Sequence, residues 1–222
     1  MVPIKENLVP KDKYAIKCPY TRTPTRVVIH NTANDAPAAN EISYMRYNDL
    51  EISFHYAVDD VNIVQGIPEN RNAWASGDGH GKGNMEGIHI EICYSKSGGE
   101  KFDTAEQNAA EFTASLLKKY GWGIDKVTKH RDYDGKYCPH RTLDRGWQRF
   151  LSMVKRYMEP AKAPVASKFT PYLIRKNCRD ALNIRKGPST NYGILGQIKD
   201  TLRYTIVEER SGPGSHNGWG RL

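Results

Sequence analysis

The segment KHRDYDGKYCPHR, residues 129–141, gathers two histidines, a cysteine and a lysine in a stretch with almost no apolar side chain. Imidazole nitrogen and thiolate sulfur are ligands that zinc prefers in proteins, so His130 and Cys138 could each supply one. A third candidate, His30, ends the apolar run VVIH. Three protein ligands leave a fourth position for water, as in a catalytic zinc site. A lone histidine at a strand end is usually an ordinary polar residue, but the three together predict a metal site.

A candidate base lies in the stretch GIHIEIC, residues 87–93. The period of two in a strand puts its isoleucines on one face and His89, Glu91 and Cys93 on the other. Glu91 thus lies in a strand suited to burial, where an unpaired carboxylate costs several kcal/mol. It should therefore have either an internal ion-pair partner or a chemical role. Lys136, two residues before Cys138, is open to two interpretations, an ordinary solvated lysine or a cation that reaches the same metal-bound group.

Strands and helices that would position these residues alternate along the first part of the chain, which predicts an α/β fold. Apolar runs predict strands at 25–30, 54–58, 61–65 and 87–93, with a hairpin across Asp59-Asp60, and a strand before His130. Apolar spacing of three to four residues predicts helices after Asp35, at 104–120 and at 143–158. Thr104 and Gln107 form a candidate capping box for the second helix, and Gly121 is its expected C-cap.

A change of composition near Met158–Phe169, toward Pro, Ala, Lys and Ser, predicts a linker at 159–169 between a domain at 1–158 and one at 170–222. Short apolar runs between Gly, Pro, Asn and Ser predict a small all-β second domain. Its final GWGRL resembles a strand start without continuation, so we expect an incomplete domain. Residues 1–160 carry 22 basic and 21 acidic side chains, and residues 161–222 carry 11 and 4. This +7 tail indicates either an anionic partner (nucleic acid, a membrane surface or a cell-wall polymer) or, equally, only a well-solvated small domain.

Several classes of protein are disfavoured by composition. The mean hydropathy is −0.69, and no window has the roughly 20 apolar residues of a membrane helix, so we expect no membrane insertion. The N-terminal MVPIKENLVPKDKY lacks the apolar core of a secretory signal. Four scattered cysteines are too few for a disulfide framework and predict reduced thiols. No nucleic-acid-binding motif is recognisable, so we do not expect nucleic acid as the partner.

The segments VVIHNTA, ISFHYAVDD, AWASGDGHGKGN, IHIEIC and KHRDYDGKYCPHR closely resemble the type 2 N-acetylmuramoyl-L-alanine amidases, notably phage endolysins and autolysins of Gram-positive hosts. The likeness spans about residues 25–156. It implies a mixed central sheet flanked by helices, related to the peptidoglycan recognition proteins. It also implies one zinc ion held by His30, His130 and Cys138, with Glu91 as acid and base and Lys136 stabilising the oxyanion.

The same resemblance suggests side chains that could flank the substrate, each of which could equally have a structural role: Phe54, His55, Trp74, His80 and Asn84. Phe54 stands where some more distant relatives have a tyrosine, and its ring cannot transfer a proton. His89 stands where many relatives have a small residue. His140 could support the metal site without being a ligand.

The tail resembles a bacterial SH3-like wall-binding domain through LNIRKGPSTNYGILG, with Cys178 as a small core residue. The two resemblances imply a zinc enzyme that hydrolyses the bond between N-acetylmuramic acid and L-alanine in peptidoglycan, with anionic wall polymers as a further partner. We expect a phage or prophage endolysin made in the host cytoplasm and released to the wall through a holin. A mother-cell autolysin also fits. The main alternative is a non-catalytic peptidoglycan-recognition protein.

Overall fold

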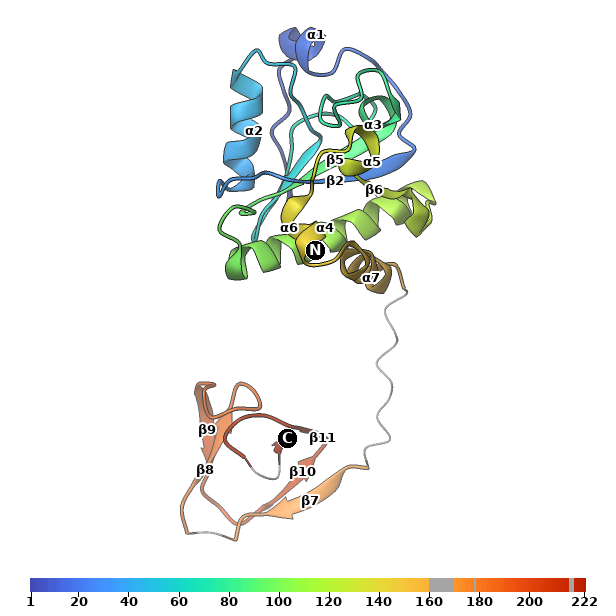
Figure 1. Ribbon diagram of the computed structural model, residues 1–222. Helices are drawn as coiled ribbons and strands as arrows, with labels where there is room; N and C mark the ends of the chain where they lie inside the picture. Colours follow the sequence, from blue (N-terminus) through green and yellow to red (C-terminus); the bar gives the residue numbers. More distant parts are fainter. Residues whose placement is uncertain (160–169, 178, 216–217) are drawn as a thin grey trace. The chain divides into compact units, whose positions relative to one another are not determined.

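The computed structural model describes residues 1–159, 170–177, 179–215 and 218–222, and it separates into two units, Met1–Ala161 and Lys162–Leu222 (Figure 1). The division falls within the predicted linker at 159–169, of which 160–169 lie outside the described residues, as does Cys178. Cys18, Cys93 and Cys138 are free thiols, as expected. Among the described residues, no helix is both long and apolar enough to cross a membrane.

The first unit is built on a six-stranded mixed sheet with the order β1-β4-β3-β5-β2-β6. Neighbouring strands are parallel except β3 and β4, which form the predicted antiparallel hairpin. This arrangement confirms the mixed α/β fold class. The strands are β1 (Ile4–Glu6), β2 (Arg26–Asn31), β3 (Tyr56–Val58), β4 (Ile63–Gln65), β5 (Gly87–Ile92) and β6 (Val127–Lys129).

The central strands β2 and β5 are buried along almost their whole length, including polar residues such as His30 and His89. They pair in parallel with Ile29 opposite Ile90 and His30 opposite Glu91. Because the two strands are parallel, their carboxyl ends lie at the same end of the sheet. The register therefore brings the predicted ligand His30 and the predicted base Glu91 to one place.

Helices pack against the sheet and against one another (Figure 1). α2 (Ala38–Tyr47) contacts β3 and β4, whereas α4 (Gly99–Tyr120) contacts β3 and β5 and lies beside α7 (Trp147–Met158). The predicted apolar positions of α4 are buried, except that Tyr120 is only partly covered. The remaining helices are short: η1 (Lys11–Lys13), α1 (Tyr14–Lys17), α3 (Lys82–Glu86), η2 (Ile124–Lys126), α5 (Arg131–Asp134) and α6 (His140–Asp144).

Two helix predictions need correction. α4 begins at Gly99, so Thr104 is not its N-cap; the Thr104 hydroxyl donates to the Glu100 carbonyl inside the helix, 2.9 Å away. Gln107 donates instead to the Tyr157 hydroxyl at 2.9 Å, and the capping box is wrong. The expected C-cap is confirmed, because Gly121 has a φ of 69°.

The helix predicted at 143–158 is two helices, α6 and α7, because Gly146 between them has a φ of 99°. That conformation favours glycine and cannot continue an α-helix. The break leaves Leu143 on α6, while Phe150 and Val154 of α7 are buried as expected.

The described part of the second unit consists of antiparallel strand pairs, as an all-β domain requires. β7 (Tyr172–Arg175) pairs with β10 (Arg203–Ile206), β8 (Leu182–Arg185) with β9 (Ile194–Ile198), and β11 (Glu208–Arg210) with β12 (Trp219–Arg221). Ile198 and Ile206 are its buried apolar side chains among the described residues. The SH3-like resemblance of this unit stays a prediction.

Candidate active site

A cleft of about 1270 Å³ opens in the first unit, where β2 and β5 reach their carboxyl ends. His30, Glu91, His130, Lys136 and Cys138 all line it. Clefts beyond the carboxyl ends of parallel strands are frequent ligand sites in α/β proteins. The structure thus gathers every residue for which the sequence suggested a metal-binding or catalytic role.

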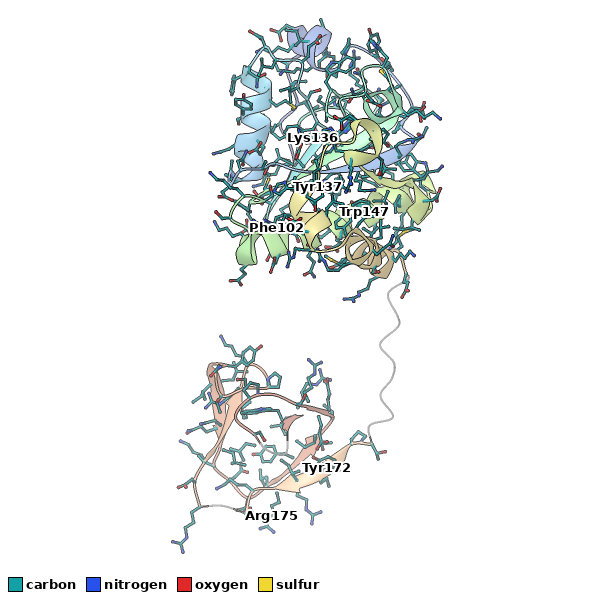
Figure 2. All side chains as sticks on the ribbon, in the orientation of Figure 1. Phe102, Lys136, Tyr137, Trp147, Tyr172 and Arg175 are labelled. Carbon is teal, nitrogen blue, oxygen red and sulfur yellow. The ribbon has the colours of Figure 1, made fainter. Side chains whose placement is uncertain are left out.

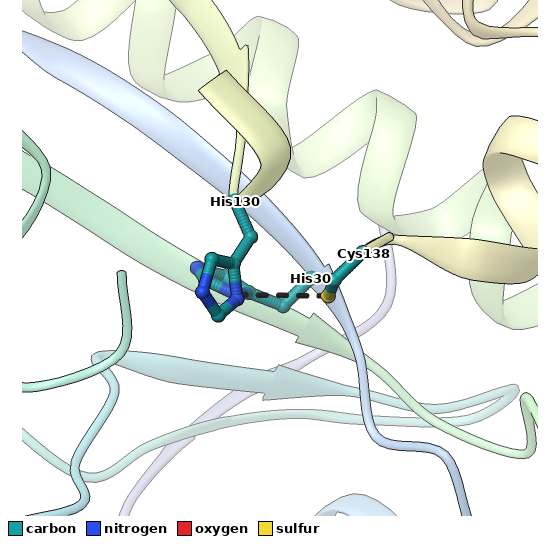
Figure 3. A group of neighbouring side chains, drawn as sticks. All are labelled: His30, His130 and Cys138. Carbon is teal, nitrogen blue, oxygen red and sulfur yellow. Dashed lines mark hydrogen bonds between the residues drawn. The ribbon is translucent and has the colours of Figure 1, made fainter. Parts of the chain in front are cut away.

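The three candidate ligands come from separate elements and converge at the floor of the cleft (Figure 3). His30 lies in β2, His130 follows β6, and Cys138 precedes α6. His30 Nδ1 lies 3.2 Å from His130 Nδ1 and 3.9 Å from Cys138 Sγ, and the ligand atoms of all three lie within 4.8 Å of one another. All three side chains are buried.

The separations of 3.2 Å and 3.9 Å are within about 0.3 Å of those that a tetrahedral zinc ion requires. Tetrahedral bonds of the usual lengths place two nitrogen ligands roughly 3.3 Å apart and a nitrogen and a sulfur roughly 3.6 Å apart. Burial lowers the pKa of His30 and of His130, so both imidazoles are neutral and can offer a lone pair. Burial, and then the charge of Glu91, raises the pKa of Cys138 to about 12. Binding of a metal would therefore release the thiol proton.

The metal-facing atom of His130 is set by Asp134, which the sequence analysis did not single out. His130 Nε2 lies 3.1 Å from Asp134 Oδ2. A hydrogen on Nε2 that donates to this carboxylate leaves the Nδ1 lone pair free for a metal, a common arrangement around zinc-binding histidines. The sequence signal was available, since Asp134 lies four residues after His130 on the helical turn of α5.

Asn31 ties the end of β2 to α6 and so holds the Cys138 loop. Its side-chain oxygen accepts the backbone N–H groups of Arg141 at 3.0 Å and Thr142 at 3.2 Å. Its backbone N–H also opposes the rise in the pKa of the Cys138 thiol that burial causes. His140 contributes from outside the ligand set, with its Nε2 3.2 Å from the Ser95 carbonyl oxygen.

Glu91 is an unpaired carboxyl inside the protein. Its Oε2 is buried without a hydrogen-bond partner, and it forms no ion pair within the described part of the chain. Burial, and then the charge of Glu41 nearby, raises the pKa of Glu91 to about 8, while Lys136 opposes the shift. The internal salt bridge considered from the sequence is therefore not seen. A carboxyl that titrates near neutral pH is suited to accept and return a proton.

Lys136 stands at the rim of the cleft, exposed, in the loop after α5 (Figure 2). Its positive charge opposes the rise in pKa that burial causes at both Glu91 and Cys138. Its backbone N–H donates to Asp134 at 2.8 Å, which anchors the loop. Lys136 can thus present a positive charge to a group bound in the cleft.

Four of the five candidate substrate residues line the cleft: Phe54, Trp74, His80 and Asn84. Trp74 and His80 form an edge-to-face cluster with Tyr20, which the sequence analysis missed because it lies outside the resembling segments; the ring centroids are 5.4–6.2 Å apart. Asn84 has its amide engaged by the loop, accepting N–H groups of Ala75 and Ser76 and donating to a carbonyl. Asn84 therefore shapes the wall of the cleft.

His55 does not reach the cleft. It is fully buried and absent from the lining, with Nδ1 accepting the backbone N–H of His89 at 3.1 Å and Nε2 2.9 Å from the Arg71 carbonyl oxygen. Its ring also stacks on that of His89. The expected contact between His55 and substrate does not fit this position, because the strand hairpin turns the side chain into the core.

An open cleft that ends in three buried metal-ligand side chains beside an unpaired carboxyl has the arrangement of a metal-dependent hydrolase. The family model for N-acetylmuramoyl-L-alanine amidase matches residues 20–141, and the chain belongs to that family. The match includes the three candidate ligands, Glu91 and Lys136.

Curated relatives of this chain are amidases of the same family. The chain is 51% identical over 181 residues to the N-acetylmuramoyl-L-alanine amidase XlyB of Bacillus subtilis, a match that covers 79% of this chain and 57% of XlyB. It is 50% identical over 190 residues to the amidase CwlA of the same organism, covering 82% of this chain and 70% of CwlA. The chain thus spans little more than half the length of XlyB.

Solved structures support the fold. The structure of PlyL is 52% identical, with a TM-score of 0.67, and the match covers 68% of this chain and 96% of PlyL. The solution structure of the PlyG catalytic domain is 50% identical, with a TM-score of 0.68, and the match covers 72% of this chain and 98% of that domain. Both confirm the mixed sheet flanked by helices.

Proposed function

We propose that this protein hydrolyses the amide bond between N-acetylmuramic acid and L-alanine in bacterial peptidoglycan, with one zinc ion, and so lyses the cell wall. The observation that carries the proposal is the convergence of His30, His130 and Cys138 beside Glu91 in one open cleft. The family of the chain supplies the bond and the substrate class.

Zinc held by the three ligands would supply a Lewis acid that polarises the amide carbonyl and lowers the pKa of water. Glu91 takes a proton from the attacking water and returns it to the amine of L-alanine as the bond breaks. In the metal-free protein burial raises the pKa of Glu91 to about 8, and the positive charge of a bound zinc ion would lower this pKa and favour the carboxylate that accepts the proton. Lys136 stabilises the negative charge that develops on the carbonyl oxygen.

Substrate contacts follow from the lining of the cleft. Trp74, His80 and Tyr20 offer an aromatic wall on which the substrate can pack, and Phe54 adds an apolar surface. Phe54 cannot exchange a proton, so Glu91 serves as both acid and base.

We further propose that residues 1–158 are the catalytic domain, 159–169 a linker, and 170–222 an SH3-like domain that binds the wall. The excess of basic side chains after residue 160 supports attraction to anionic wall polymers. This organisation suits an endolysin that reaches the wall from the cytoplasm after holin action, and equally a mother-cell autolysin.

The deciding experiment is digestion of purified Gram-positive cell walls by metal-depleted protein, before and after zinc is restored, with mass spectrometry of the fragments. We expect zinc-dependent release of stem peptides with a free L-alanine amine and intact glycan chains. Glu91→Gln should abolish release. Glu86→Gln is the matched control, because Glu86 is ion-paired with Arg26 and lies outside the cleft lining. Wall binding without cleavage by the zinc-loaded protein would favour the non-catalytic recognition protein.

A further inference from the structure

His30 has a second ring nitrogen that faces away from the candidate metal site. Its Nδ1 faces His130 and Cys138, while its Nε2 lies 3.0 Å from Nδ1 of His89. Both side chains are buried, so no bulk water competes for this contact. The two metal-site histidines are therefore backed by different groups, His130 by a carboxylate and His30 by a third histidine.

The hydrogens of this pair follow from the metal site. If His30 offers its Nδ1 lone pair to a metal, the single hydrogen of its neutral ring is on Nε2. That hydrogen is directed at His89, so Nδ1 of His89 must be an acceptor and its own hydrogen must be on Nε2. The Gly83 carbonyl oxygen and His89 Nε2 border the same space beside Gly87, but Nε2 makes no hydrogen bond with the described part of the chain.

The surroundings of His89 hold its ring in this orientation. Its backbone N–H donates to His55 Nδ1, and the His55 ring stacks on it at a centroid distance of 5.6 Å. A Cβ at Gly87 would lie 2.5 Å from the Gly83 carbonyl oxygen and 3.2 Å from His89 Nε2. The slot for the imidazole thus depends on the missing side chain at Gly87 and on the buried His55.

We propose that His89 is a positioning residue that accepts the Nε2 hydrogen of His30 and thereby fixes the tautomer in which Nδ1 is free for zinc. The inference rests on the metal site of the proposed function. It adds to that function a determinant of zinc affinity that does not touch the substrate. A hydrogen-bond partner behind a metal ligand typically changes metal affinity ten- to a hundredfold.

The test compares His89→Leu with His89→Asn. Asn and Leu have the same branched shape and leave a similar space in place of the ring, but only the Asn oxygen can occupy the position of Nδ1 and accept a hydrogen bond. Zinc affinity of the full chain is measured by competition with a chelator. We expect His89→Leu to bind zinc about ten- to a hundredfold more weakly and His89→Asn to recover most of that loss.

Nuclear magnetic resonance of the ring nitrogens supplies a second readout that a purely structural role would not move. In the zinc-loaded wild-type protein near pH 7.5, the Nε2 hydrogen of His30 should be shared with Nδ1 of His89, seen as a coupling between these two ring nitrogens, and the hydrogen of His89 should be on its Nε2. His89→Leu should lose this coupling. If that variant does not fold, the zinc-loaded wild-type spectrum decides alone, and a hydrogen on Nδ1 of His89 would overturn the proposal.

Two results of the zinc titration would also overturn the proposal. One is equal zinc affinity in wild type and His89→Leu. The other is an equal loss of affinity in His89→Leu and His89→Asn, which would show that only the packing of the ring matters. These outcomes are distinct from a failure of the proposed function. A wild-type protein that binds zinc but releases no stem peptide refutes the amidase reaction while leaving the His89 measurement valid.

Discussion

Replacing the unpaired carboxyl of Glu91 should stabilise the metal-free protein, and more so as the pH rises. Glu91 is partly buried, its Oε2 is buried without a hydrogen-bond partner, and burial raises its pKa from 4.5 to about 8. Between these values the folded state holds a proton that the unfolded state has lost, so the free energy of unfolding falls with increasing pH. Below pH 4.5 both states are protonated, and above pH 8 both are ionised, so the slope vanishes.

The magnitude follows from the same pKa values. Each tenfold difference in proton affinity corresponds to about 1.4 kcal/mol, so ionised Glu91 costs the folded state about 5 kcal/mol at most. Between pH 6 and pH 9 the cost grows by up to about 3 kcal/mol. Glu91→Gln keeps the shape and removes the charge. Its stability relative to wild type should therefore rise by up to that amount over this pH range.

The assay is urea denaturation of chelator-treated protein, read by hydrogen exchange of the β5 peptide, which reports on the first unit alone. Glu86→Gln is the control. Hydrogen bonding from Thr25, followed by the charge of Arg26, lowers the pKa of Glu86. Glu86 is ionised in both folded and unfolded chains from pH 6 to pH 9, so its variant should differ from wild type by a constant amount. A pH-independent difference for Glu91→Gln would refute the reasoning.

Three further variants test the remaining parts of the site. Cys138→Ser should lose zinc on dialysis, because a hydroxyl is a poor zinc ligand. The control is Cys18→Ala, which should keep its zinc because Cys18 is buried outside the cleft. Elemental analysis measures the zinc content, and zinc retained by Cys138→Ser would exclude the thiolate as a ligand. Asp134→Asn should weaken zinc binding about ten- to a hundredfold in chelator competition, and unchanged affinity would remove Asp134 from the metal site. Lys136→Met should slow wall hydrolysis about a hundredfold or more with zinc content unaltered, and an undiminished rate would rule out its electrostatic role.

The central part of the fold and the metal site could be predicted from residue types and spacing. β2 is recognisable from its apolar run of β-branched residues, VVI, and β5 from isoleucines that recur at every second position. The ligand set was recognisable because histidine and cysteine at strand ends and in a polar loop have few structural uses together. The start of α4 could not be predicted, because Gly99 gives a weak helix signal and Thr104 resembles an N-cap. In the structure α4 packs on β3 and β5 and begins about one turn earlier, at Gly99.

The hydrogen-bond partners of the candidate metal ligands could not be predicted, because these contacts join side chains from segments that are far apart in the sequence. His89 was visible only as an unusual residue in a strand, and His55 only as a neighbour of the cleft. In the structure β3 and β5 are adjacent parallel strands, so the two imidazoles stack in the core and His89 reaches His30 across the next strand pair. The period of two correctly placed His89 and Glu91 on one face of β5. It could not show that one of them contacts a metal ligand while the other is left unpaired, since that depends on which side chains β2 and the 131–138 loop bring opposite them.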